Sequence, residues 1–144
     1  MAQNYLQFSC SLSLGDSEKS IKATSIYETM LEERNNSGED VLNFDLEVDD
    51  SNPGGLWIYA DESGNPDDVI EFIVQCSKEL SLSGFWGFSW AFTCSKPRLN
   101  EFGGGAVVID LSTGEVVSLL DSQSFVHNVI SEKTKEAETQ VKET

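Results

Sequence analysis

Residues 35–77 contain no lysine and no arginine. The same stretch contains eleven carboxylates: Glu39, Asp40, Asp45, Glu47, Asp49, Asp50, Asp61, Glu62, Asp67, Asp68 and Glu71. A field of one sign over part of a small domain repels nucleic acid and anionic membrane surfaces, and it attracts basic proteins or metal cations. The sequence therefore predicts a cationic partner and disfavours direct binding to nucleic acid or membrane.

Cysteine and histidine are also scarce. Cys10, Cys76 and Cys94 lie far apart without CxxC spacing, which argues against a disulfide framework and against a zinc site. We expect three buried free thiols. His127 is the only histidine, and no motif places it beside a nucleophile. The sequence thus predicts a protein that is not an enzyme and has no cofactor, no metal site and no catalytic residue.

Long apolar runs are absent as well. No segment approaches the 18 or so consecutive apolar residues of a membrane span, and the N-terminus lacks a basic region followed by an apolar one. A cytoplasmic location is therefore expected. The hydrophobic fraction of 39% is normal for a globular chain, so the net charge of −16 does not indicate general disorder. We expect one domain over residues 1–130, followed by a polar and frayed tail over residues 131–144.

Alternating polar and apolar residues indicate the strands. The period of two is clearest over residues 6–14, and further strands are predicted over residues 43–49, 56–60, 84–94, 106–111 and 115–120. Helices are expected from Asp16 or Ser17 to Arg34, from Pro66 to about Leu80, and from Ser122 onwards. In the last helix, four apolar residues are expected to face inward: Phe125, Val126, Val129 and Ile130. This order predicts an α+β fold, a mostly antiparallel sheet of about six strands with two to three helices packed on one face.

The second predicted strand carries regularly spaced charge. Asp45, Glu47 and Asp49 alternate with apolar residues, so they point to one side at intervals of roughly 6.6 Å. Such a ridge fits a groove whose Lys and Arg side chains read the charge of a phosphate backbone. The predicted partner-binding residues are Asp45, Glu47, Asp49, Asp50, Asp61, Glu62, Asp67 and Asp68. The alternative is a solvated face that protects a sheet edge from aggregation.

The strand over residues 84–94 has one strongly aromatic face, formed by Trp86, Phe88, Trp90 and Phe92. An exposed face of this kind can stack nucleic-acid bases, but those binders need a positive groove. Only two cations lie near it, in a strongly acidic chain. We therefore expect these side chains to pack in the core under the helices.

The loop after this strand is the second candidate site. Lys96 and Arg98 precede three glycines, Gly103, Gly104 and Gly105, whose backbone N–H groups can approach an anion closely. The glycines precede a strand, so neither the P-loop nor the dinucleotide fingerprint is matched. Two alternatives stay open: a small-ligand or anion-binding module, and a structural loop in which Arg98 pairs with local carboxylates.

Residues 87–106 (GFSWAFTCSKPRLNEFGGGA) and residues 5–10 (YLQFSC) carry a resemblance. They are similar to a family of small acidic bacterial and mobile-element proteins. The resemblance implies a stable domain built around the Trp90 strand and the following loop, and it transfers no catalytic residue. In size and charge, the chain also resembles mobile-element inhibitors of host defence nucleases, such as anti-CRISPR and anti-restriction proteins.

These observations favour a non-enzymatic acidic protein that blocks a basic, nucleic-acid-binding partner, such as a host defence nuclease complex, by mimicking nucleic acid. An alternative function that is equally consistent with the acidic charge is that of an immunity protein that neutralises a toxin. The oligomeric state is left open, because exposed sheet surface can be buried in a homodimer.

Overall fold

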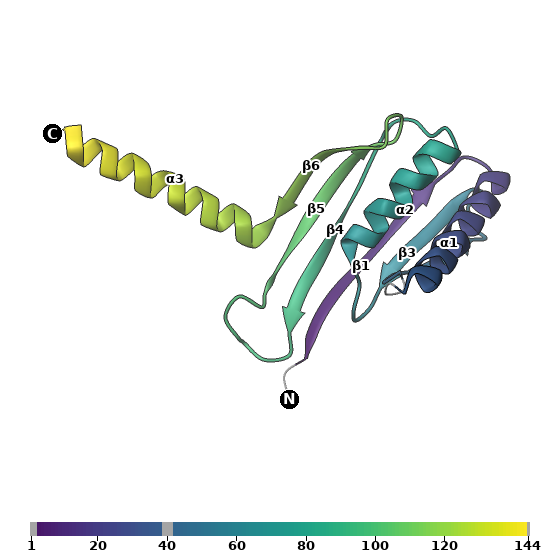
Figure 1. Ribbon diagram of the computed structural model, residues 1–144, viewed down its shortest axis with the longest axis horizontal. Helices are drawn as coiled ribbons and strands as arrows, with labels where there is room; N and C mark the ends of the chain where they lie inside the picture. The colour runs from purple at the N-terminus through teal and green to yellow at the C-terminus, as the bar shows by residue number, and fades with distance from the viewer. Residues whose placement is uncertain (1–2, 39–41, 144) are drawn as a thin grey trace.

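The computed structural model describes residues 3–38 and 42–143 as one antiparallel sheet with three helices (Figure 1). Its elements are β1 (Asn4–Ser13), α1 (Ser17–Ser37), β2 (Asp45–Asp49), β3 (Gly55–Ala60), α2 (Pro66–Glu79), β4 (Phe85–Cys94), β5 (Gly103–Asp110), β6 (Glu115–Asp121) and α3 (Ser122–Glu143). The six strands lie in the order β2-β3-β1-β4-β5-β6, and every pair of neighbours is antiparallel. The predicted α+β class is confirmed, and the predicted strands all form.

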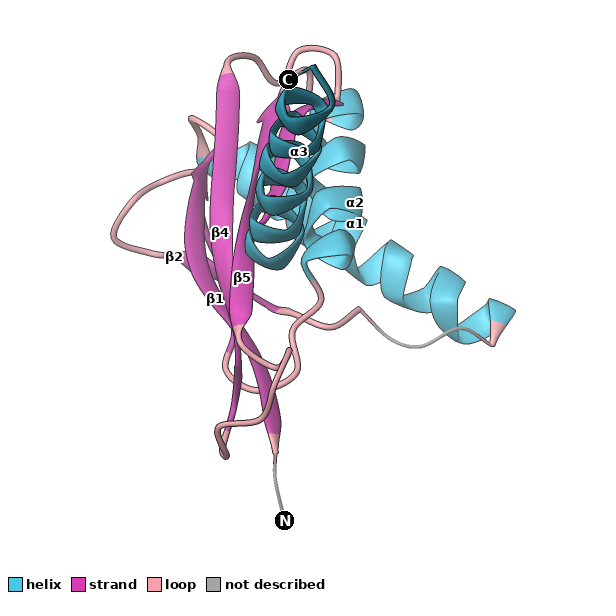
Figure 2. Ribbon diagram, turned by 90° about the vertical axis from the view of Figure 1, so that its left-hand side faces the viewer, coloured by secondary structure: helices cyan, strands magenta, loops and turns pink. Residues whose placement is uncertain are grey.

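Helices α1 and α2 cover one face of the sheet, as the edge-on view shows (Figure 2). The alternation of the strands explains this layering, because every second residue of a strand points to the same face. On β1, Phe8 and Leu12 are buried, and on β3 Leu56 and Ile58 are fully buried. The core lies between these residues and α2, whose Phe72 and neighbouring apolar side chains are also fully buried.

Both covering helices begin and end where local chemistry directs them. The side chain of Asp16 accepts a hydrogen bond from the Lys19 N–H and caps α1, and Gly38 ends that helix in the left-handed conformation, with φ of 76°. The side chain of Asn65 caps α2 by accepting from the Asp67 N–H, and Pro66 occupies the first turn. The predicted start of each helix is therefore confirmed.

Aromatic packing joins the helices to the sheet. The ring of Tyr27 on α1 lies 5.1 Å from that of Phe44 and 6.0 Å from that of Phe72 on α2. Phe8 and Phe88 meet edge to face at 5.6 Å between β1 and β4. Trp86 and Trp90 are half-buried against this core. Trp86, Phe88 and Trp90 thus pack under the helix layer, as predicted, whereas Phe92 is half-buried and lies outside the core cluster.

The third helix departs from the prediction. It leaves the end of β6 and projects beyond the sheet instead of joining the helix layer (Figure 1). Its predicted inward residues are all exposed: Phe125, Val126, Val129 and Ile130. The expectation that they face inward is wrong, because Asp121 ends β6 and Ser122 begins α3, leaving no loop in which the chain can turn back. The helix also continues to Glu143, through most of the segment expected to be a frayed tail.

None of the helices in residues 3–38 and 42–143 has both the length and the apolar character needed to cross a membrane.

Candidate functional site

The acidic residues of β2 line one edge of the sheet, because β2 is the first strand in the spatial order and, among the described residues, pairs with β3 alone. Asp45 lies opposite Tyr59, and Glu47 lies opposite Trp57. Residues paired across an antiparallel ladder share a face. Asp45, Glu47 and Asp49 therefore point to the face without helices, while Leu46 between them packs toward the core. The predicted ridge of carboxylates on one side of this strand is present.

Two aromatic side chains of β3 lie beside the carboxylates. The rings of Trp57 and Tyr59 stack 3.9 Å apart at 22°, and the indole N–H of Trp57 donates to Ser9 Oγ at 2.9 Å. The Tyr59 hydroxyl donates to Glu47 Oε1 at 3.1 Å. Trp57 is 42% exposed, so part of its ring is open to a partner. Sequence reasoning missed this pair, although the alternation of β3 places both rings opposite the buried Leu56 and Ile58.

Tyr59 also shows where the carboxylates converge. Its pKa is raised above the ordinary value of a phenol by partial burial, by the hydrogen bond to Glu47, and by the charges of Glu47, Asp45 and Asp61. Each of these effects disfavours the phenolate. Carboxylates from β2 and from the turn after β3 thus act on a single side chain.

The remaining acidic residues of this edge lie in the turns that flank β3. Asp50 is exposed in the turn between β2 and β3, and Asp61 and Glu62 are exposed just after β3. The backbone of this second turn is held to β1, because the Leu6 N–H donates to the Glu62 carbonyl at 2.8 Å and the Gln7 side chain donates to the Asp61 carbonyl at 2.7 Å. A rigid backbone therefore presents both carboxylates.

We name this surface the acidic edge and define it by six carboxylates and two rings: Asp45, Glu47, Asp49, Asp50, Asp61, Glu62, Trp57 and Tyr59. Shallow hollows lie on it: one of about 290 Å³ is lined by Asp45, Asp61 and Glu62, one of about 350 Å³ by Glu47, Asp49, Asp50 and Trp57, and one of about 500 Å³ by Trp57, Tyr59 and Asp61. Across residues 3–38 and 42–143, none of the ion pairs includes one of these six carboxylates. Their charge is therefore free to act on a partner.

The other two predicted partner-binding residues, Asp67 and Asp68, have different surroundings. Asp68 is 4% exposed; its carboxylate lies 2.8 Å from the Arg34 guanidinium and accepts the Asn43 N–H at 2.9 Å. Although burial lowers the pKa of Arg34, hydrogen bonds to Asp68 and Glu71 raise it overall. Asp68 is thus an internal ion-pair partner and does not belong to the exposed surface. Asp67 is exposed in the first turn of α2.

Glu39 and Asp40, which contribute to the acidic stretch of the sequence, lie outside the described residues.

The glycines of the predicted anion-binding site form part of β5. Gly103, Gly104 and Gly105 pair with Phe92, Ala91 and Trp90 of β4. None of the three has a positive φ, and the Gly104 N–H donates to Ser122 Oγ at 2.9 Å. Backbone nests that hold anions need left-handed residues and free N–H groups. Lys96 and Arg98 are exposed in the preceding loop. The glycine run is therefore part of a paired strand and not a backbone nest, and an anion site that uses Lys96 and Arg98 stays a prediction.

The glycines instead make room for neighbouring side chains. A Cβ at Gly105 would overlap the indole ring of Trp90 and would lie 2.5 Å from the Leu120 carbonyl oxygen. A Cβ at Gly103 would lie 2.9 Å from Ser122 Oγ. The run is thus required by close packing between β4, β5, β6 and the start of α3.

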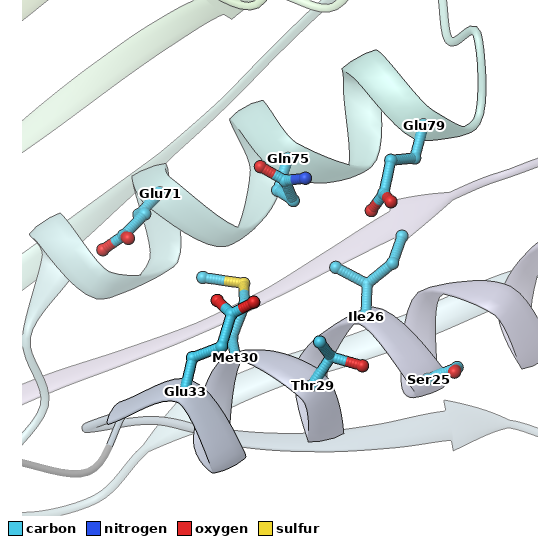
Figure 3. A pocket seen from close by; sticks show the side chains of 8 residues that line it. All are labelled: Ser25, Ile26, Thr29, Met30, Glu33, Glu71, Gln75 and Glu79. Carbon is cyan, nitrogen blue, oxygen red and sulfur yellow. The ribbon is translucent and has the colours of Figure 1, made fainter. Parts of the chain in front are cut away.

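Another hollow, of about 440 Å³, lies between α1 and α2 (Figure 3). Ile26 and Met30 of α1 lie at its centre, and three glutamates line it: Glu33, Glu71 and Glu79. Glu71 is already bound, with its carboxylate 2.7 Å from Arg34. Sequence reasoning missed this groove, because nothing in either helix indicates that the two lie side by side.

The thiols of Cys10 and Cys76 have little nucleophilic character. Burial raises the pKa of Cys10 to about 11, and burial together with the charge of Glu79 raises that of Cys76 to about 12. All three cysteines are free; Cys76 and Cys94 are buried and Cys10 is half-buried. Since the thiolate is the reactive form, Cys10 and Cys76 are unreactive near neutral pH. His127 lies exposed on α3, far along the chain from any of them.

Within the described part of the chain, no three side chains of histidine, cysteine, aspartate or glutamate are grouped as metal ligands. The chemistry that the acidic edge supports is noncovalent attraction of cationic groups.

No family model, curated protein or solved structure matches this chain.

Proposed function

We propose that the protein is an acidic binding protein that attaches through the acidic edge to a basic, nucleic-acid-binding protein and competes with nucleic acid for it. The observation that carries the proposal is the row of Asp45, Glu47 and Asp49, which share one face of an edge strand and take part in none of the ion pairs among the described residues. A host defence nuclease is the kind of partner that fits.

Charge spacing supports this choice of partner. Alternate residues of a strand lie roughly 6.6 Å apart, so the three carboxylates form a regular series of single negative charges. Proteins that bind nucleic acid without reading its sequence place Lys and Arg along the phosphate backbone. A groove of this kind accepts any rigid anionic ridge of suitable shape, whereas a partner with an acidic surface would be repelled by the acidic edge.

The aromatic pair supports arginine-rich partners in particular. A guanidinium group stacks on an aromatic ring and pairs with a carboxylate at the same time, which an ammonium group does less well. The partly exposed ring of Trp57 lies on the same face as Glu47 and Asp49. An arginine of the partner can therefore contact the ring and the carboxylates together.

The test compares two variants that lose the same charge at different places. The first neutralises the β2 row, as Asp45→Asn, Glu47→Gln and Asp49→Asn. The control neutralises Glu28, Glu32 and Glu33, which are exposed on α1, each to Gln. Both variants and the unmodified protein serve as baits for affinity capture from a bacterial lysate, and bound proteins are eluted with duplex DNA.

We expect a basic protein to be captured by the unmodified bait and by the α1 variant, to be displaced by DNA, and to be lost from the β2 variant. Neutralising three charge contacts should weaken binding at least about 100-fold, because each close charge pair at an interface contributes 1.5 kcal/mol or more. Equal capture by both variants would mean that net charge and not the acidic edge does the binding. A captured protein that DNA does not displace would contradict nucleic-acid mimicry.

A further inference from the structure

The two edges of the sheet differ sharply in polarity. The outer strand β2 bears three carboxylates, which discourage edge-to-edge pairing, whereas every residue of β6 is exposed and four of its seven are large and aliphatic: Val116, Val117, Leu119 and Leu120. Their exposed fractions run from 46% to 61%. An exposed apolar edge strand invites pairing with another chain. The β6 edge therefore has the properties of an interface.

Helix α3 continues this apolar surface. Phe125, Val126, Val129 and Ile130 recur at the three- and four-residue spacing of one helical stripe and are between 38% and 60% exposed. A stripe of this kind normally packs against another element. Here α3 projects beyond the β6 edge, away from the sheet of its own chain (Figure 1). Its apolar stripe has no cover within the described chain.

On the helix-bearing face of the sheet, helix α2 leaves the surface over β6 uncovered. It covers Val107 and Ile109 of β5, which are buried, but the cover stops before β6. Leu119 pairs with Val107 and so points to the same face, yet it is 61% exposed. The place that a third helix of the layer would occupy, over β6, is therefore open while α3 points outward.

Charge is almost absent from this part of an otherwise acidic chain. Between Glu115 and Glu132 the only acidic residue is Asp121, and there is no lysine or arginine. Asp121 is occupied locally, since its carboxylate accepts the N–H groups of Gln123 and Ser124 at the start of α3. Two copies of a protein with a net charge of −16 repel one another in general, but not through this surface.

From these observations we infer that β6 and α3 form a homodimer interface. Two copies are related by a two-fold axis; β6 pairs antiparallel with β6 of the second copy, and each α3 packs its apolar stripe over the second copy's β6. The arrangement is isologous, so one surface is complementary to itself and the contact closes without forming a filament. It also explains why α3 follows β6 without a loop, because the helix reaches outward to the second copy.

The exposed area approaches what such a dimer needs. Leu120 lies opposite Ala106 and points to the other face of the sheet, and the remaining seven apolar side chains of β6 and α3 expose roughly 650 Å² per copy, against the 800 Å² or so that each partner contributes to a stable protein interface. Hydrogen bonds between the paired edges would add to this contact. A monomer seldom leaves an apolar patch of this size uncovered.

The dimer places the acidic edges at opposite ends. Because β2 and β6 are the two outer strands, the paired sheets would form one sheet of about twelve strands with β2 at each end. The inference stands apart from the proposed function, since the interface contains no residue of the acidic edge. It implies two binding surfaces in one particle.

The test measures the mass of the full chain in solution by sedimentation equilibrium, over protein concentrations from about 1 to 100 µM, where even the weaker interfaces of this area are substantially associated. The test variant is Phe125→Ser with Ile130→Ser on α3. Its matched control is Phe85→Ser with Ile21→Ser, which removes the same two side-chain types from exposed positions of β4 and α1. A third variant, Leu119→Ser, tests β6.

We expect the unmodified chain and the control to have twice the 15.9 kDa chain mass. The α3 variant should dissociate at least about 100-fold more readily, since the dimer loses four apolar contacts, and Leu119→Ser should weaken it about 10-fold. For a dimer the melting temperature rises with protein concentration, and this dependence should disappear in the α3 variant. Circular dichroism confirms that each variant is folded.

A monomeric unmodified chain at about 100 µM would overturn the inference and leave the surface for a different protein. An α3 variant that dimerises as well as its control would overturn the role of α3. An unchanged dimer for Leu119→Ser would overturn the pairing through β6.

Discussion

Asp68 and its neighbour Asp67 have the same side chain and adjacent positions in α2 but opposite surroundings. Asp68 is buried between the Arg34 guanidinium and the Asn43 N–H, whereas Asp67 is exposed. Replacing Asp68 with Ala leaves the mostly buried Arg34 with Glu71 alone. We expect the free energy of unfolding to fall by about 3 kcal/mol, since removing one partner of a buried pair costs about 3–5 kcal/mol and Glu71 retains part of the interaction. Urea denaturation followed by circular dichroism measures it.

The control for this prediction is Asp67→Ala. It removes only a favourable charge at the N-terminus of α2, which contributes about 0.3–1 kcal/mol. Similar losses for the two variants would mean that the ion pair with Arg34 adds little to stability.

The different burial of the two aspartates could not be predicted from the sequence. Asn65 and Pro66 predict the start of α2. At a helix start, any aspartate in the first turn is explained by its favourable interaction with the helix dipole. Nothing local separates Asp67 from Asp68. Their difference depends on Arg34, which comes from α1, and the packing of α1 beside α2 is a contact between distant parts of the chain.

At the scale of elements, β5 is held closely between β4 and β6 because Gly105 has no side chain. A Cβ at this position would overlap the Trp90 indole and approach the Leu120 carbonyl. We expect Gly105→Ala to lower the free energy of unfolding by about 1–3 kcal/mol, the usual effect of forcing extra volume into a packed site. Thermal and urea unfolding measure this loss.

A double variant separates the ring from the backbone. Trp90→Phe removes the part of the indole that the new Cβ would meet, so Gly105→Ala should cost less in the Trp90→Phe background than in the unmodified chain. Additive losses would show that the indole is not the obstacle. The same measurements in phosphate buffer test the anion-site alternative, because a ligand that binds only the native state must raise the melting temperature.

The elements themselves were largely predictable, and their partners were not. Alternation over residues 6–14 and 84–94 specifies both a strand and the face that it buries. The spacing of Phe125 and Val129 likewise specifies an apolar stripe on a helix, but a period does not say what covers the stripe. The acidic row of β2 was predictable from alternation alone. The alternation of β3 also predicts that Trp57 and Tyr59 share a face. Their position next to Glu47 depends on the register between β2 and β3, which the sequence does not specify.

At the scale of the whole molecule, repulsion between the acidic side chains destabilises the folded state, and burial of apolar side chains outweighs this repulsion. The net charge of −16 in 144 residues repels itself, and the acidic edge concentrates this repulsion on two neighbouring strands. Salt shortens the distance over which charges interact, from about 30 Å at 0.01 M to about 10 Å at 0.1 M. Added salt should therefore stabilise the protein, whereas salt weakens most complexes between oppositely charged partners.

We expect the melting temperature to rise by roughly 2–4 °C between 10 mM and 300 mM NaCl at a fixed protein concentration, the shift that about 1 kcal/mol produces in a domain of this size. Differential scanning calorimetry measures it. The variant with Asp45, Glu47 and Asp49 neutralised should show a smaller rise than the variant with Glu28, Glu32 and Glu33 neutralised, although the two have the same net charge. The reason is that β2 carboxylates lie close to Asp61, and α1 also carries Lys19 and Lys22. Equal slopes would show that total charge alone sets the response, and that the acidic edge holds no excess repulsion for a cationic partner to relieve.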